Sequence, residues 1–141
     1  MEPMEPASPR PPMTAAGLLA RERERYERVT PEQAIVEREA GALLVDTRSA
    51  DAIGREGAIP GAHRVPLSVL PWRMDPASPW SDPALADRGS RVIVLCQDGF
   101  SSSLAVGWLL DLGFERATDV EGGVRAWIEA GLPVEPVEAG P

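Results

Sequence analysis

The residue best suited to chemistry is the one cysteine of the chain, Cys96, because of what precedes and follows it. An apolar run over 92–95 leads into Cys96, and the segment 97–103 after it is rich in serine. A second apolar pattern, with helical spacing, follows at 104–110. This order predicts a buried strand, a tight loop and a helix. Backbone N–H groups and the helix dipole favour a thiolate at such a position, and the thiolate is the nucleophilic form of cysteine.

A buried structural cysteine is the alternative interpretation, since cysteine packs well as a small hydrophobic residue. The glycine and serine residues after Cys96 favour an exposed loop instead. Successive N–H groups of such a loop can point at one centre and bind an anion. Cys96 is therefore the candidate nucleophile, and the loop residues expected to surround its sulfur are Gln97, Asp98, Gly99, Phe100, Ser101 and Ser102.

The composition is that of one ordinary domain. The chain has 141 residues, of which 43% are hydrophobic, and no apolar run approaches the roughly 18 residues of a membrane span. A lone cysteine cannot form an internal disulfide, which favours a reducing cytoplasm. The net charge of −8 argues against nucleic acid as a partner. We therefore expect a cytoplasmic protein that binds neither nucleic acid nor a membrane.

The charge run at 21–25 belongs to a segment with a helical pattern that precedes the main domain. We interpret it as a solvated helix packed loosely on the domain, with a partner-docking arm as the alternative. Glu24 and Arg28 have the spacing of a favourable ion pair on one helix face. The expected organisation is a disordered, proline-rich segment at 1–13, an N-terminal helix at 14–28, a folded domain at 29–135 and a C-terminal tail at 136–141.

Strand and helix patterns alternate within the folded domain. Thr30, Pro31 and Gln33 have the types and spacing of a capping box with proline at the first helical position. The alternation predicts an α/β domain with a mostly parallel central sheet flanked by helices on both faces. The expected strands are 43–46, 63–65, 91–95 and 117–120. The expected helices are 31–40, 51–56, 69–73, 82–87, 102–112 and 124–130.

Four segments, taken in this order, resemble the single-domain form of the rhodanese-like family over about residues 29–135. Each is weakly specific alone, and their order and spacing carry the resemblance. The segments are 44–48, similar to the first core strand and its Asp-x-Arg; 56–62, similar to the Gly-His-Ile-Pro-Gly-Ala signature, with Ala58 in place of histidine; 94–102, similar to the active-site loop; and 122–134, similar to the C-terminal signature.

The resemblance implies a sulfurtransferase. In that family a cysteine thiolate, here Cys96, attacks a donor such as thiosulfate and holds the sulfur as a persulfide. The acceptor is cyanide, a thiol or a protein, which includes a sulfur-carrier protein. No cofactor and no metal are expected. Asp46 and Arg48 end a strand at the same sheet edge as Cys96, and we expect them to support the site through bidentate hydrogen bonds.

The loop departs from the family pattern at Ser101, where arginine or lysine is common. Asp98 also adds a negative charge beside the cysteine. Loss of one charge-assisted hydrogen bond would weaken the binding of dianionic thiosulfate by about tenfold, unless Arg48 or Arg55 replaces the charge. We expect Ser101 or Ser102 to cap the following helix, and Ser101 to contact the substrate.

Three other functions stay open at this point. Phosphatase or arsenate-reductase chemistry on the related scaffold would need an arginine at position 102, where this chain has Ser102. A non-catalytic interaction module is favoured by the missing loop cation and by the extra N-terminal helix. A redox-sensing thiol would need glutathione or a partner protein, because the chain has no second cysteine.

Overall fold

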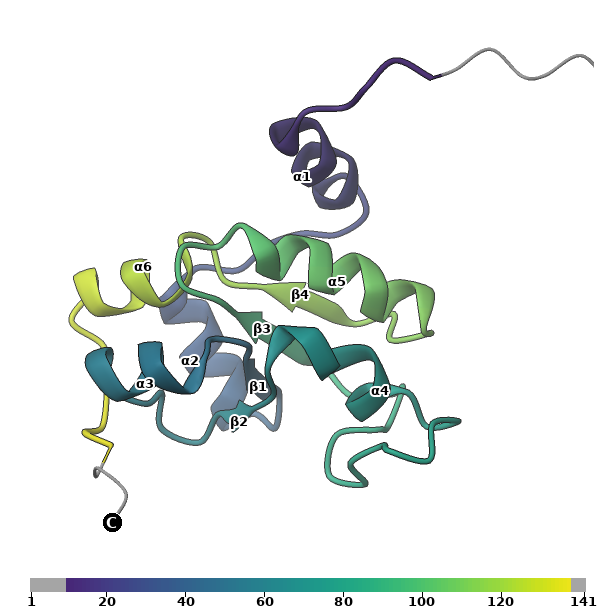
Figure 1. Ribbon diagram of the computed structural model, residues 1–141. Coiled ribbons are helices and arrows are strands. Elements are labelled where there is room, and N and C mark those ends of the chain that lie inside the picture. Colours follow the sequence, from purple (N-terminus) through teal and green to yellow (C-terminus); the bar gives the residue numbers. More distant parts are fainter. Residues whose placement is uncertain (1–9, 138–141) are drawn as a thin grey trace, which may run out of the picture.

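A parallel four-stranded sheet forms the centre of the computed structural model, which describes residues 10–137 (Figure 1). The strands lie in the order β2-β1-β3-β4, and all three neighbouring pairs are parallel. The mostly parallel sheet expected from the sequence is thus confirmed. The strands are β1 (Leu43–Asp46), β2 (His63–Arg64), β3 (Val92–Leu95) and β4 (Ala117–Asp119).

Helices connect the strands, as parallel pairing requires. The predicted capping box is present at the start of the helix after Val29. The Thr30 hydroxyl accepts from the Gln33 N–H at 3.2 Å, and the Gln33 side chain accepts from the Thr30 N–H at 2.8 Å. The helices are α1 (Ala15–Arg23), α2 (Pro31–Glu39), α3 (Ala50–Glu56), the 3-10 turn η1 (Leu67–Val69), α4 (Leu70–Met74), α5 (Ser101–Asp111) and α6 (Gly123–Glu129).

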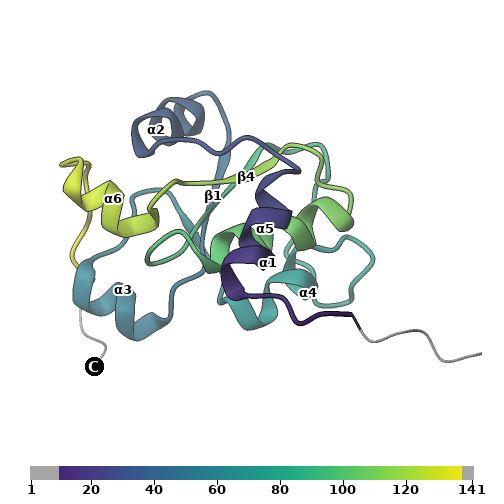
Figure 2. The ribbon, with the colours of Figure 1, turned by 90° about the horizontal axis from the view of Figure 1, so that it is seen from above.

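Two hydrophobic cores lie on opposite faces of the sheet, so the expected helical layers on both faces are confirmed. Side chains of β3 alternate between them: Val92 and Val94 face the core under α4 and α5, whereas Ile93 and Leu95 face the core under α2 and α6. Figure 2 shows α2 and α6 on one side, α4 and α5 on the other, and α1 lying over α5. The strand that carries Cys96 is therefore buried on both faces.

The register brings the predicted site residues to one edge of the sheet. Asp46 lies opposite Leu95, and the Thr47 N–H donates to the Leu95 carbonyl at 2.8 Å. Consequently Arg48 and Cys96 both follow the carboxyl ends of neighbouring strands, where parallel sheets commonly place their sites.

Two expectations about secondary structure were wrong. Residues 82–87 form turns instead of a helix, because the Asp82 carboxylate and carbonyl take up the N–H groups of 84–86 and hold a single turn. The N-terminal helix ends at Arg23 instead of 28, and Arg28 pairs with Asp119 instead of Glu24. Residues 1–9 of the expected disordered segment and 138–141 of the expected tail lie outside the described residues. No helix in the described part is long and apolar enough to cross a membrane.

Candidate functional site

Cys96 lies on the floor of an open cavity of about 390 Å³. Cys96 itself is only 5% exposed. The exposure that the sequence suggested for the loop is found at its tip, where Phe100 is 61% exposed. β3 delivers the cysteine to this position and α5 begins five residues later. The cavity is lined by Thr47, Arg48, Ser49, Ala52, Arg55, Glu56, Cys96, Gln97, Ser101 and Arg125.

Backbone amides converge on the cysteine sulfur, as the sequence predicted. The Gly99 N–H donates to Cys96 Sγ at 3.1 Å and the Ser102 N–H donates at 3.3 Å. Gly99 has a φ of +82°, and a Cβ there would lie 2.8 Å from the nitrogen of Gly122. The Cys96 loop, residues 96–101, therefore needs glycine at this position for both conformation and space. Amides so arranged stabilise negative charge on the sulfur.

The first turn of α6 holds the other side of the Cys96 loop. The Val124 N–H donates to the Cys96 carbonyl at 2.9 Å, and the Arg125 N–H donates to the Gln97 carbonyl at 3.0 Å. A Cβ at Gly123 would overlap the Cys96 carbonyl oxygen. This close backbone approach at the glycine pair 122–123 keeps the Cys96 and Gln97 carbonyls bonded to α6.

Asp46 and Arg48 form a buried fork at the end of β1. Arg48 Nη2 donates to Asp46 Oδ2 at 2.7 Å and to the Gly57 carbonyl at 2.9 Å, while Nε donates to both carboxylate oxygens at 3.1 Å. The pair therefore ties the end of β1 to the end of α3. Arg48 Nη1 is buried with no hydrogen-bond partner among residues 10–137, and lies 4.0 Å from the Glu56 carboxylate.

Positive charge predominates on the cavity wall, through Arg48, Arg55 and Arg125 against Glu56. Gln97 Nε2 donates to that glutamate at 2.7 Å. The sequence suggested that Asp98 adds an unpaired negative charge beside the cysteine. In the structure Arg125 pairs with this carboxylate at 2.9 Å. The sequence missed this pair because α6 follows the Cys96 loop by more than twenty residues.

The expected capping of α5 by Ser101 or Ser102 was wrong. Phe100 occupies the N-cap position, and no side chain of the described residues caps the helix. Ser102 Oγ instead donates to Asp119 Oδ2 at 2.7 Å, and Ser103 Oγ donates to the same oxygen at 2.8 Å. A buried carboxylate needs such donors, so it takes the hydroxyl that the cap would have used. Ser101 lines the cavity.

Asp119, at the end of β4, is a fully buried carboxylate that our sequence reasoning did not select. Besides the two serines, it accepts from Tyr26 Oη at 2.9 Å and from Arg28 Nε at 2.9 Å. Burial, aided by the Asp119 charge, raises the pKa of Tyr26 well above its usual value, so the hydroxyl remains a donor. A carboxylate ending a predicted strand, at the same edge as Cys96, was the signal available in the sequence.

Comparisons with known sequences point to one family. The model of the rhodanese-like domain matches residues 30–130. A sulfurtransferase of Allochromatium vinosum is 33% identical over 92 residues, which are 65% of this chain and 77% of the relative. The thiosulfate sulfurtransferase GlpE of Pseudomonas savastanoi is 34% identical over 113 residues, which are 80% of this chain and 96% of the relative.

Solved structures give the same fold. A protein of unknown function from Rhodopseudomonas palustris, with the description "possible tyrosine phosphatase", has a TM-score of 0.81 at 28% identity, covering 92% of this chain and all of its own. The human single-domain sulfurtransferase TSTD1 has a TM-score of 0.62 at 25% identity, covering 74% of this chain and 96% of its own.

Proposed function

We propose, from the premise that the chain belongs to the rhodanese-like domain family, that Cys96 carries sulfane sulfur as a persulfide between a small donor and an acceptor. Relatives of this chain include a sulfurtransferase and several thiosulfate sulfurtransferases. The observation that best supports this proposal is the position of the Cys96 sulfur in the cavity, where two backbone N–H groups donate to it.

The proposed reaction has two displacements on sulfur. In the first, the Cys96 thiolate forms a bond to the sulfane sulfur of thiosulfate. The sulfur–sulfur bond of the donor breaks, and its electron pair leaves with sulfite. In the second, a thiolate or cyanide attacks the outer sulfur of the persulfide, and the Cys96 thiolate is regenerated as the leaving group. No net oxidation of the protein occurs over the cycle.

The charge of the cavity supports an anionic donor despite the neutral Ser101. Arg55 and Arg125 lie on its wall, and the buried Nη1 of Arg48, which has no hydrogen-bond partner among residues 10–137, is a donor available to a sulfonate oxygen. The Gly99 and Ser102 N–H groups would hold the charged outer sulfur of the persulfide after the first step. Acceptors of the proposed enzyme are a thiol, cyanide or a sulfur-carrier protein, and the proposed compartment is the cytoplasm, where a lone cysteine stays reduced.

Phosphatase chemistry deserves comparison because of the description attached to the Rhodopseudomonas palustris structure. Such chemistry needs a cation that closes the loop around the phosphoryl oxygens, and position 102 is where an arginine would do so. Ser102 is fully buried here, and its hydroxyl is committed to Asp119. The arrangement therefore favours sulfur transfer.

Thiocyanate formation from thiosulfate and cyanide tests the proposal. Wild-type protein is expected to form thiocyanate, and Cys96→Ser is expected to form none while its thermal midpoint stays close to that of wild type. Equal activity of the Cys96→Ser variant would exclude the cysteine as the sulfur carrier. Absence of activity in wild type with thiosulfate and with low-molecular-weight persulfides would favour an interaction or redox-sensing module.

A further inference from the structure

α1 lies along α5 (Figure 2), and charged side chains make the ion pair that joins this segment to α5. No residue of α1 is fully buried. Arg25 donates to Glu22 at 2.8 Å and to Asp111 of α5 at 2.6 Å. A Cβ at Gly107 would overlap the Glu22 carboxylate, so glycine in α5 permits this close approach. The polar side chains of this segment make specific contacts with the domain, and these contacts reach the Cys96 loop.

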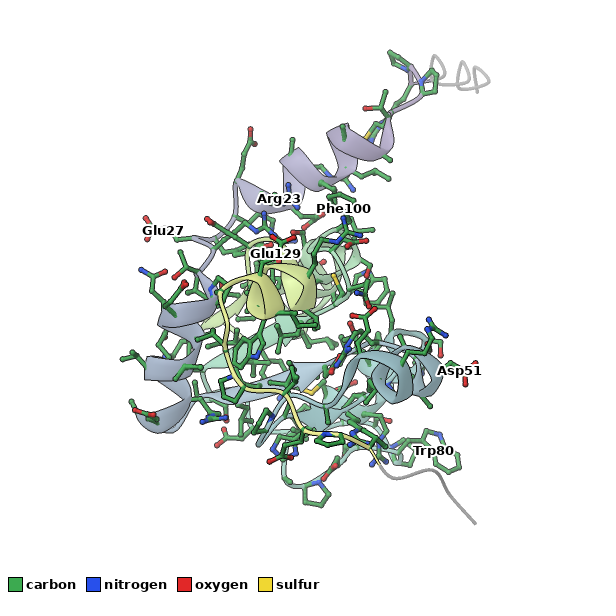
Figure 3. The ribbon with its side chains drawn as sticks, turned by 90° about the vertical axis from the view of Figure 1, so that its left-hand side faces the viewer. Arg23, Glu27, Asp51, Trp80, Phe100 and Glu129 are labelled. Atoms are coloured by element: carbon green, nitrogen blue, oxygen red, sulfur yellow. The ribbon has the colours of Figure 1, made fainter. Side chains whose placement is uncertain are left out.

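Two arginines from this segment reach one carbonyl in the Cys96 loop. Arg23 Nη2 donates to the Gly99 carbonyl at 2.8 Å, and Arg28 Nη2 donates to the same oxygen at 3.0 Å. Arg23 Nε also donates to Ser103 Oγ at 2.9 Å. Figure 3 shows Arg23 beside Phe100, the residue that follows this carbonyl. A carbonyl has two lone pairs, and both are used here by charged donors.

Gly99 is consequently held from two sides. Its N–H donates to Cys96 Sγ, and its carbonyl accepts from the two guanidinium groups. In a trans peptide the C=O and N–H point in opposite directions, so the Phe100 N–H points away from the arginines. Glycine has more backbone freedom than any other residue. The hydrogen bonds from the two arginines restrict that freedom at Gly99.

The same segment also pairs the buried carboxylate of Asp119. Asp119 lies fully buried and accepts hydrogen bonds from Ser102 and Ser103 in the first turn of α5. Arg28 pairs with Asp119 at 2.9 Å and leaves the charge of Arg23 as a surplus. Guanidinium groups stay protonated at every working pH.

We propose that Arg23 and Arg28 are positioning residues of the Cys96 loop, which hold the Gly99 carbonyl and thereby keep Gly99 in the conformation in which its N–H donates to Cys96 Sγ. We call these contacts of Arg23 and Arg28 with the Gly99 carbonyl the brace of the Cys96 loop. Neither arginine lines the cavity, so they act through the loop and do not touch the donor. The kinetic side of this inference rests on the proposed function, whereas the structural side does not.

The test compares Arg23→Gln with Arg21→Gln, which removes the same charge from the same helix at a position whose side chain is 58% exposed. Hydrogen exchange of the amides at 97–102 is measured together with sulfur transfer from thiosulfate. For Arg23→Gln we expect several-fold faster exchange in the loop and a kcat about tenfold lower, with the KM for thiosulfate little changed. Arg21→Gln should match wild type in all three quantities.

Arg23→Lys keeps the charge but loses the fork that spans Ser103 and Gly99, and should recover part of the lost kcat. The thermal midpoint of each variant shows that the comparison is made on folded protein. Equal loop exchange in Arg23→Gln and Arg21→Gln would overturn the brace, and so would an increase in KM with unchanged kcat. If wild type transfers no sulfur, the proposed function fails, and loop exchange alone still decides whether the brace exists.

Discussion

At the scale of single residues, Ser101 occupies the loop position where the family resemblance leads us to expect arginine or lysine. Its side chain lines the cavity beside Cys96, and its hydroxyl makes no cap on α5 in the described structure. Arg55 and Arg125 stand on the same wall, but one of them is committed to Asp98. The cavity therefore carries less positive charge for binding an anion than it would carry with an arginine at position 101.

Ser101→Arg is expected to improve the reaction with thiosulfate. A guanidinium at this position would offer two parallel N–H donors to the sulfonate oxygens. We expect kcat/KM for thiosulfate to rise by about tenfold, with a much smaller gain for an uncharged persulfide donor. Ser101→Gln is the matched control, because it adds length without charge. Equal gains for both donors, or a poorer thiosulfate reaction in a folded variant, would show that the missing cation does not limit the enzyme.

Tyr26→Phe tests the buried network around Asp119 through the pH dependence of stability. The hydroxyl donates to the carboxylate, and burial raises its pKa above the ordinary value. Removing this bond should lower the free energy of unfolding by about 1–2 kcal/mol at neutral pH. Because the pKa is higher in the folded than in the unfolded chain, the contribution is complete below about pH 10 and is lost as pH rises further.

Urea unfolding of both proteins at neutral and at strongly alkaline pH measures this difference. Tyr26 is the only tyrosine in the sequence, so no second phenol confuses the comparison. We expect the stability gap between wild type and Tyr26→Phe to shrink at alkaline pH. A gap that stays constant or widens would contradict the donor role assigned to the hydroxyl.

At the scale of secondary-structure elements, α1 begins with its own cap. The Thr14 hydroxyl accepts from the Gly17 N–H at 2.9 Å, and every arginine that reaches the Cys96 loop lies after this residue. The helix and its contacts should therefore not need what comes before Thr14.

Deletion of residues 1–13 is expected to leave the thermal midpoint within about 2 °C of wild type and to leave sulfur transfer unchanged. A proline-rich segment of this composition cannot bury enough apolar surface to stabilise the domain. Differential scanning calorimetry and the thiocyanate assay measure the two quantities. A midpoint lowered by many degrees would instead assign the segment a place in the folded domain.

The elements were more predictable from the sequence than the contacts between them. The run 92–95 and the capping box at Thr30 are local signals, and both features are present at the expected positions. The brace is not local: Arg28 reaches Gly99 across 71 residues, and Tyr26 reaches Asp119 across 93. A charge run such as 21–25 looks like a solvated face until the partner helix is in place, which is why its role in the site was missed.

At the scale of the whole molecule, the site collects arginines within an acidic protein, and three of them are paired with carboxylates: Arg28 with Asp119, Arg48 with Asp46 and Arg125 with Asp98. The net charge is −8, yet five arginines from separate parts of the chain surround the Cys96 loop, three on the cavity wall and two behind Gly99. The parallel sheet makes this possible, because β1, β3 and β4 end at the same edge and bring their loops together. The fold thus brings together around the Cys96 loop five arginines that are spread over about a hundred residues of the sequence.

The mass of the peptide that contains Cys96 tests the central claim most directly. Reduced protein is incubated with thiosulfate, trapped with an alkylating reagent without further reduction, digested and analysed by mass spectrometry, with Cys96→Ser treated in parallel. The account predicts that the Cys96 peptide gains one sulfur atom, and that cyanide added before trapping removes it as thiocyanate. A Cys96 peptide that never gains sulfur from thiosulfate or from a low-molecular-weight persulfide would contradict the account.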